Sequence, residues 1–183
     1  MERAELEQEL ERMHAACWGW ALACCGRDRE IAEEALQSAY LRILSGQARF
    51  DGRSSMRTWV FGVIRRTVME ELRRERAREA RRAGGEVDAE LVADSASRAD
   101  IAAERSEQSA VLVAALATLS PRQREVLQLV FYHDMTIEEA AQVMHISLGS
   151  ARTHYDRGKK ALALALRPAA APVPTATPRN VSP

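Results

Sequence analysis

The sequence predicts an all-α protein made of two small helical domains. Three observations favour this fold class. Good helix formers (Ala, Leu, Arg and Glu) dominate the chain, aromatic residues make up only 5% of it, and apolar residues recur every three or four positions. β-branched and aromatic strand formers are too few for an all-β fold. With 183 residues, of which 46% are hydrophobic, the chain is long enough to fill two small cores.

The first domain is expected over residues 1–83 and contains three helices. An apolar stripe at three- and four-residue spacing begins at Leu6, Leu10 and Met13 and continues through Trp18 to Cys24. A loop rich in Gly and Ser separates the second helix from the third. The first helix is expected at 3–25 and ends at Gly26, and the third runs from Ser54 or Ser55 to 82. The second is expected at 28–45, with Asp28 as its N-cap. Its expected core residues are Ile31, Ala32, Ala35, Ala39 and Ile43.

The second domain is expected over residues 103–166 and contains four short helices. An acidic linker at 84–102, with a double glycine and no amphipathic period, precedes it. A Pro/Ala-rich tail at 167–183, expected to be disordered, follows it. The helices are expected at 103–118; at 121–132, opened by Ser120 and Pro121; at 137–144, with a capping box of Thr136 and Glu139; and from Ser147 to about 166.

Several protein classes are excluded by what the sequence lacks. No stretch approaches the roughly 20 apolar residues of a membrane span, and the acidic, polar N-terminal segment does not resemble a signal peptide. Phosphate-binding glycine loops and the HExxH, GxSxG and CxxC motifs are absent. Three cysteines, an odd number, do not make a disulfide framework. We expect a cytoplasmic protein that is not an enzyme and holds no metal or cofactor.

Charge is segregated along the chain, although 26 basic and 26 acidic residues give a net charge of zero. Residues 56–82 carry nine arginines against four glutamates, and 147–167 carry five basic residues against one aspartate. Between them, residues 86–107 carry seven acids against two arginines. Two basic helices in separate domains indicate two contacts with one polyanion. The alternative is that both are ordinary solvated helix faces with ion pairs four residues apart.

Residues 136–166 have the pattern of a helix-turn-helix. A short alanine-rich helix, a tight turn at His145–Ser147 and a second helix follow one another. The second helix presents polar and basic residues opposite its apolar side, as a helix in the DNA major groove does. A small helical hairpin that binds no DNA is the alternative. Its expected inward residues are Leu148, Ala151, Tyr155, Gly158 and Leu162, and its outward residues are Ser150, Thr153, Asp156, Arg157 and Lys160.

Three segments together resemble the sigma-70 family of bacterial transcription initiation factors. The stretch LSPRQREVLQLVFYHDMTIEEAAQVMHISLGSARTHYDRGKKAL (119–162) resembles region 4 of that family. DREIAEEALQSAYLRIL (28–44) resembles region 2.2, and FDGRSSMRTWVFGVIRRTVMEELRR (50–74) resembles regions 2.3–2.4. With only these two domains and a short linker, the chain is similar to the extracytoplasmic function (ECF) subfamily. The resemblance implies binding to core RNA polymerase, through its β′ clamp and β flap, to promoter DNA and to an anti-sigma factor.

The second helix is expected to bind the polymerase, since the resemblance places the β′ clamp contact in region 2.2. A helical wheel independently puts apolar residues among acids on its outward side, which is typical of a protein interface. The alternative is that Leu41 and Leu44 pack on the first helix. The expected polymerase-binding residues are Glu30, Glu33, Glu34, Gln37, Leu41 and Leu44.

The third helix is expected to read the promoter −10 element and hold the melted strand, which requires cations for phosphates and a surface for unstacked bases. Thr58, Arg65, Arg73 and Arg76 are predicted on one outward side, while Trp59 is assigned mainly to the core. Arg66-Thr67 departs from the family pattern near the pocket for a flipped −10 base. The expected −10 residues are Ser54, Ser55, Arg57, Thr58, Trp59, Arg65, Arg66, Arg73 and Arg76.

The helix-turn-helix is expected to read the −35 element. Two positions depart from the family pattern there, His154 and Asp156, so a −35 sequence preference is not carried over. An ion pair of Asp156 with Arg152 or Lys160 is the alternative to a base contact. The expected −35 residues are Arg122, Ser150, Arg152, Thr153, His154, Asp156, Arg157 and Lys160. The acidic linker is expected to follow channels built for nucleic acid.

Two rival functions stay open on the sequence alone. A stand-alone helix-turn-helix regulator that binds duplex DNA without polymerase explains residues 119–166 but leaves the arginine-rich helix without a role. A redox- or metal-sensing module would use Cys17, Cys24 and Cys25, with His14 three residues before the first thiol. Because Cys17 and Cys24 share the apolar stripe of the first helix, buried structural thiols are the favoured interpretation.

Overall fold

The computed structural model describes residues 3–83 and 107–166. The described residues form helices and turns without a strand. The predicted linker at 84–102, the first residues of the predicted 103–118 helix and the predicted tail at 167–183 lie outside this part of the chain. The helices are α1 (Arg3–Cys24), α2 (Arg29–Leu44), α3 (Met56–Ala83), α4 (Glu107–Ala117), α5 (Pro121–Leu127), η1 (Gln128–Tyr132), α6 (Ile137–Met144) and α7 (Leu148–Ala165).

Side-chain caps fix where several helices begin, as the sequence predicts. Asp28 accepts hydrogen bonds from the backbone N–H groups of Glu30 and Ile31, at 3.0 and 3.1 Å, and so starts α2. Thr136 and Glu139 form the expected capping box of α6, with N–H to oxygen distances of 2.9 and 3.1 Å. Ser147 accepts from Ser150 N–H at 3.1 Å and starts α7.

The predicted helix at 121–132 has the expected extent but two geometries. Residues 121–127 are α-helical, and η1 continues them as a π-helix. The N–H of His133 donates to the Gln128 carbonyl, five residues back, at 3.2 Å. This wider turn carries Phe131, Tyr132 and His133 into a different register from that of a regular α-helix. The π geometry is not visible in the apolar spacing of the sequence.

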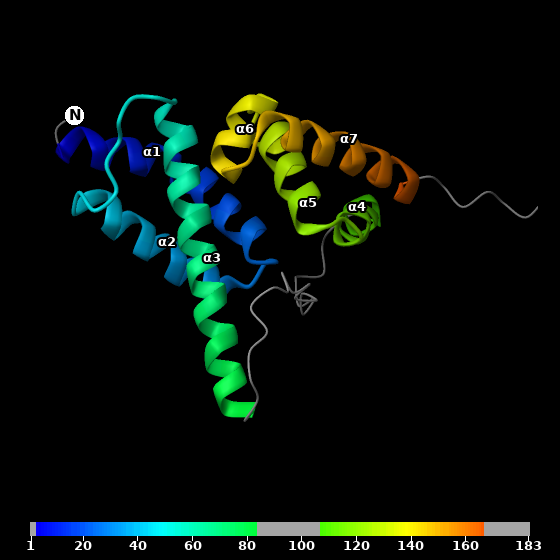
Figure 1. Ribbon diagram of the computed structural model, residues 1–183, viewed down its shortest axis with the longest axis horizontal. Coiled ribbons are helices and arrows are strands. Elements are labelled where there is room, and N and C mark those ends of the chain that lie inside the picture. The colour runs from blue at the N-terminus through cyan, green and yellow to red at the C-terminus, as the bar shows by residue number, and fades with distance from the viewer. Residues whose placement is uncertain (1–2, 84–106, 167–183) are drawn as a thin grey trace, which may run out of the picture.

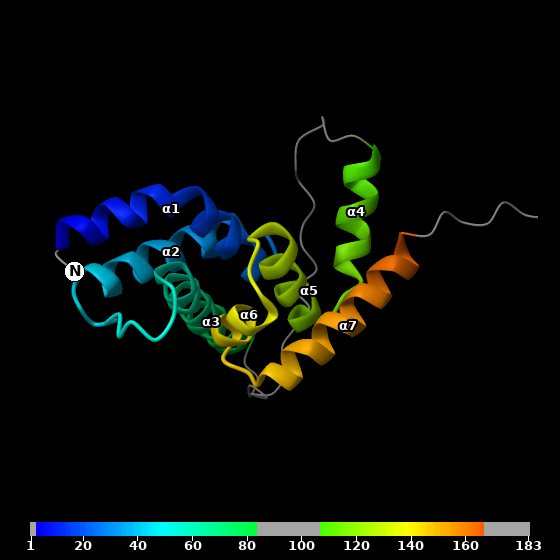
Figure 2. The same cartoon turned by 90° about the horizontal axis from the view of Figure 1, so that it is seen from above.

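The two groups of helices pack against each other directly. Figure 1 shows α3 between α1 and α2 on one side and α5 and α6 on the other, and Figure 2 shows α4 and α7 at the far end. Buried residues from both groups form one continuous hydrophobic cluster, including Trp20, Phe61, Leu129 and Val143. The sequence predicts each group separately, but nothing in its periodicity indicates this shared core.

The orientations predicted for Thr58, Arg65 and Leu44 are wrong. Thr58 was expected to face outward but is 2% exposed, and the Arg65 side chain is only 13% exposed. Arg65 is covered by Glu125 of the second group of helices, and Thr58 lies two helical turns before Arg65 on the same side of α3. Leu44 was expected to face outward but is half-buried against the core, as the alternative interpretation held for this residue. Trp59, assigned mainly to the core, is half-buried and leans on Phe50, with ring centroids 5.4 Å apart.

Candidate nucleic-acid interface

Helix α7 presents one continuous polar surface. Its inner side is seated on α5 so closely that a Cβ atom at Gly158 would lie 3.1 Å from Leu127 Cδ1 and 3.2 Å from Gln123 Cβ. This seating leaves the opposite side open to solvent. The exposed residues there are Ser150, Arg152, Thr153, Asp156, Arg157 and Lys160, as the sequence predicts.

The structure brings a residue of α5 to the same surface. Arg122 lies in the first turn of α5 and is exposed, and its charge acts on His154 of α7 together with that of Arg157. Burial lowers the pKa of half-buried His154, and the two arginines lower it further, so the imidazole is neutral at pH 7. The resulting surface is cationic without an additional charge on His154.

Asp156 is the only acid on α7. Its side chain is exposed, and within the described part of the chain it takes part in none of the ion pairs. The pairs with Arg152 or Lys160 that the sequence allows are therefore not formed. A carboxylate that is free of intrahelical partners can accept a hydrogen bond from a base edge.

The arginine-rich helix α3 is exposed along only part of its length. Arg66 is exposed and forms an ion pair with Glu70 at 3.1 Å, and Glu70 also contacts Arg42 of α2 at 2.6 Å. The Arg42 guanidinium holds the pKa of Glu70 below its usual value. Of the other expected −10 residues, Ser55 and Arg73 are exposed, while Ser54, Arg57, Trp59 and Arg76 are half-buried.

Arg65 is engaged by the other group of helices. Its Nε and Nη2 atoms donate to Oε2 of Glu125 on α5, at 3.1 and 3.0 Å, and both side chains are largely buried. Burial raises the pKa of Glu125, and the guanidinium acts against that rise. In this arrangement Arg65 is not available to a phosphate. The spacing of the sequence gives no signal for the pair, because its partners are 60 residues apart.

Helix α2 presents an exposed acidic surface with one large apolar side chain. Leu41 is 68% exposed, whereas Leu44 belongs to the partly buried periphery of the core. The exposed polar residues of this surface are Glu30, Glu33, Glu34 and Gln37. Acids around an exposed leucine suit a partner helix that carries basic and apolar side chains.

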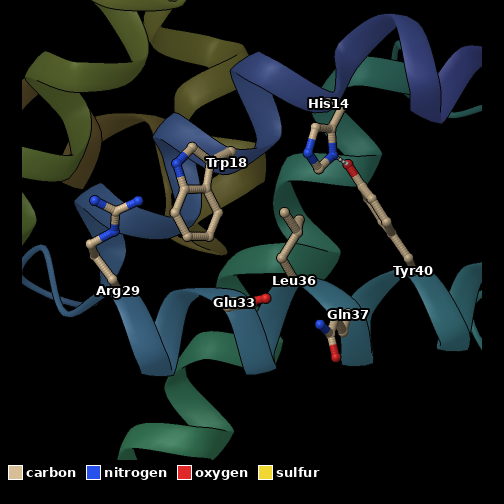
Figure 3. Close-up of a pocket in the computed structure, with 7 residues that line it drawn as sticks. All are labelled: His14, Trp18, Arg29, Glu33, Leu36, Gln37 and Tyr40. Carbon is tan, nitrogen blue, oxygen red and sulfur yellow. Dashed lines mark hydrogen bonds between the residues drawn. The ribbon is translucent and has the colours of Figure 1, made fainter.

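A groove of about 370 Å³ lies between α1 and α2 beside this surface (Figure 3). His14 and Trp18 line it from α1, and Leu36 and Tyr40 from α2. The His14 Nδ1 atom and the Tyr40 hydroxyl are 3.2 Å apart. Sequence reasoning missed this groove because Trp18 shares the apolar stripe of α1 and was assigned to the core. The four-residue spacing of His14 and Trp18 was the available signal.

The three thiols lie inside the first group of helices. Cys17, Cys24 and Cys25 are all buried, and no disulfide joins them. Burial raises the pKa of each thiol, that of Cys25 to about 12. The described residues contain no group of His, Cys, Asp or Glu that could hold a metal ion. The thiols therefore pack as small apolar side chains.

Comparison with known proteins identifies the class to which this arrangement belongs. Residues 10–78 match the family model of sigma-70 region 2, and residues 109–162 match that of sigma-70 region 4. The chain is 30% identical over 137 residues, 74% of its length, to the ECF RNA polymerase sigma factor SigX of Bacillus subtilis, of which the match covers 71%. It is 27% identical over 143 residues, 78% of its length, to the probable RNA polymerase sigma-C factor of Mycobacterium bovis, of which the match covers 74%.

Solved structures share the fold. The sigma factor RpoE of Bartonella quintana, in complex with the anti-sigma factor NepR, superposes with a TM-score of 0.67 at 22% identity. That match covers 88% of this chain and 96% of RpoE. CnrH, in complex with the cytosolic domain of CnrY, superposes with a TM-score of 0.59 at 17% identity, covering 89% of this chain and 88% of CnrH.

The chain belongs to the ECF subfamily of sigma-70 RNA polymerase sigma factors. It is a transcription initiation factor that binds core RNA polymerase and directs it to promoters by recognising −10 and −35 elements. Sigma factors are non-enzymatic. None of the described helices is long and apolar enough to cross a membrane.

Proposed function

We propose that three surfaces of this chain divide the work of promoter recognition. The acidic surface of α2, centred on Leu41, binds the β′ clamp of core polymerase. The part of α3 that carries the exposed Arg66 and Arg73 and the half-buried Arg76 binds the −10 element. The outer side of α7, together with Arg122, binds the −35 element. The observation that carries this division is that the three surfaces are separately exposed on one chain, two of them basic and one acidic.

Charge complementarity supports the two DNA contacts. Arg73, Arg152, Arg157 and Lys160 are exposed and take part in none of the ion pairs of the described chain. Cations without an internal partner exchange water and counterions for phosphate at little cost. Thr153 donates its hydroxyl to the Gly149 carbonyl at 2.9 Å, which leaves its methyl group and a lone pair for a base edge.

We further propose an anti-sigma factor as partner and the cytoplasm as the place of action. The solved relatives RpoE and CnrH are bound to NepR and CnrY. For this chain, the exposed Leu41 and the groove beside it offer a surface that such a partner can cover in competition with polymerase. In this scheme the protein itself catalyses no reaction, and RNA synthesis belongs to the polymerase.

The experiment that tests this division is a titration of labelled full-length protein with purified core polymerase. Binding in the absence of DNA is expected, and it should be weakened by a change on α2 but not by changes on α7. A protein that binds duplex promoter DNA with the same affinity with and without core polymerase would act instead as a stand-alone regulator.

A further inference from the structure

His133 lies at the centre of the contact between the two groups of helices. It follows η1, is 1% exposed, and meets Phe61 of α3 and Trp20 of α1 edge-on, with ring centroids 4.8 and 6.1 Å apart. The chain thus places a titratable ring where α1 and α3 pack against the segment that follows η1. Its role is not explained by promoter or polymerase binding.

The surroundings of His133 do not accommodate a positive charge. Its Nε2 atom is buried and has no hydrogen-bond partner among the described residues. An imidazolium there would bury an N–H donor without an acceptor. Burial, and then the nearby charge of Arg57 on α3, lower the pKa of His133 to about 4, against a smaller opposite effect of Asp134.

The other titratable groups of this contact do not act in the same direction. The thiols of Cys17 and Cys24 on α1 have raised pKa values and stay neutral. Glu125 of α5, paired with Arg65 of α3, also has a raised pKa, so its protonation favours the packed arrangement. His145, which lies against Gly62 of α3, is exposed to solvent. His133 is therefore the buried group in this contact whose protonation opposes packing.

The two groups of helices meet in ordinary van der Waals contact at two glycines. A Cβ atom at Gly62 of α3 would lie 3.8 Å from His145 Nε2 and 4.0 Å from the backbone of Val143. One at Gly19 of α1 would lie 3.8 Å from the Tyr132 ring. These contacts and the Arg65–Glu125 pair define a closed arrangement. That arrangement holds Arg65 away from solvent, with 13% of its side chain exposed.

We propose that the two domains exchange between this closed arrangement and an open one, and that protonation of His133 favours opening and releases Arg65. The opening step rests on the burial of His133 Nε2 at this contact without a hydrogen-bond partner in the described part of the chain. The use of the released Arg65 for promoter DNA rests on the proposed function. In the open arrangement His133 meets water, and its positive charge is solvated.

The direction and the pH range follow from linkage. A histidine whose pKa is about 4 in the closed arrangement and about 6.5 when exposed stabilises the closed arrangement fully above pH 6.5. That stabilisation is lost progressively as the pH falls from 6.5 toward 4. Between pH 7.5 and 5.5, protonation of His133 alone is expected to raise the ratio of open to closed molecules about tenfold, and protonation of Glu125 acts against that rise.

Single-molecule fluorescence resonance energy transfer (FRET) on the full chain measures the ratio of open to closed molecules without DNA or polymerase. Dyes are attached through unnatural amino acids at Glu11 on α1 and Ala163 on α7, both exposed. The variant Gly62→Trp, whose side chain would collide with Val143, supplies the open reference. Because no promoter is present, failure of the proposed function leaves this result unaffected.

The variants separate His133 from other acid effects. The wild type and a His14→Phe control are expected to show the same severalfold rise in the open-to-closed ratio. His133→Phe keeps a ring against Trp20 and Phe61 but cannot be protonated. Its open-to-closed ratio should change by less than about twofold between pH 7.5 and 5.5. His133→Gln serves the same purpose if the Phe variant loses helix by circular dichroism. Glu125→Gln, which mimics the protonated carboxyl, is expected to lower the open fraction at pH 7.5 and to keep the acid response.

Two results would overturn the proposal. One is a wild-type protein whose open-to-closed ratio stays constant between pH 7.5 and 5.5. The other is a His133→Phe or His133→Gln variant that responds to acid as strongly as the wild type.

Discussion

Asp156 has an outward position on α7 and no intrahelical ion pair in the described chain, which favours a role in base readout. Asp156→Ala is expected to relax base preference at one −35 position, at a cost of about 1–3 kcal/mol for the cognate base. Selection of a −35 library with polymerase reconstituted with each protein provides the measurement. Unchanged preferences with uniformly tighter binding would mean that the carboxylate only repels phosphates.

Gly158 controls how closely α7 approaches α5. Gly158→Val is expected to lower the free energy of unfolding by about 1–3 kcal/mol, because its side chain would enter space held by Leu127 and Gln123. The matched control is Gly149→Ala on the same helix, whose Cβ would meet only Ser147 Oγ, at 4.0 Å. Urea denaturation should find the control unchanged or more stable. Equal effects of both changes would show that helix propensity, not packing, decides at Gly158.

Helix α2 is expected to contribute its exposed surface, not its core side, to polymerase binding. Leu41→Asp should weaken the affinity for core polymerase about tenfold, since a desolvated apolar anchor is replaced by a charge. Circular dichroism should show an intact fold, because Leu41 is 68% exposed. Gln8→Asp, on an exposed part of α1, is the control and should bind as the wild type does. Unchanged affinity of the Leu41 variant would remove this surface from the interface.

Helix α3 is expected to contact phosphates beyond the part that the second domain covers. Replacing Arg73 and Arg76 by Ala should flatten the slope of log affinity against log salt for promoter binding by the holoenzyme. The decrease is up to about two units if each arginine meets one phosphate. Replacing Arg3 and Arg12 on α1 removes the same charge elsewhere and should leave the slope unchanged. A wild-type slope for the α3 variant would mean that these arginines face solvent in the complex.

At the scale of the whole molecule, the elements were predictable from local signals, whereas their mutual arrangement was not. Asp28, Thr136 with Glu139, and Ser147 mark helix starts through hydrogen bonds within three residues, so sequence alone reveals them. The outward side of α7 is also predictable from the sequence, because its apolar residues recur every three or four positions. The burial of Thr58 and Arg65 depends on a surface from the other domain, and helical periodicity does not contain that information.

The residues that were not predicted from the sequence owe their roles to contacts between the two domains, which local signals do not reveal. Glu125 looks like an ordinary acid in a surface helix until Arg65 is placed beside it. His133 directly follows a π-helical turn, which the apolar spacing does not reveal, and is buried in the shared core. The apolar stripe of α1 was predicted to include Trp18, but Trp20 is the tryptophan that is fully buried. Each of these residues lies where the two domains meet.

Transcription in vitro tests the central claim most directly. Purified core polymerase, a library of promoters and the full-length protein are combined, and transcripts are mapped by their start sites. We predict transcripts that depend on the protein and begin at a fixed distance downstream of paired −35 and −10 elements, with Leu41→Asp giving fewer of them. Duplex DNA binding by the protein alone, with no transcript that depends on it, would contradict the account.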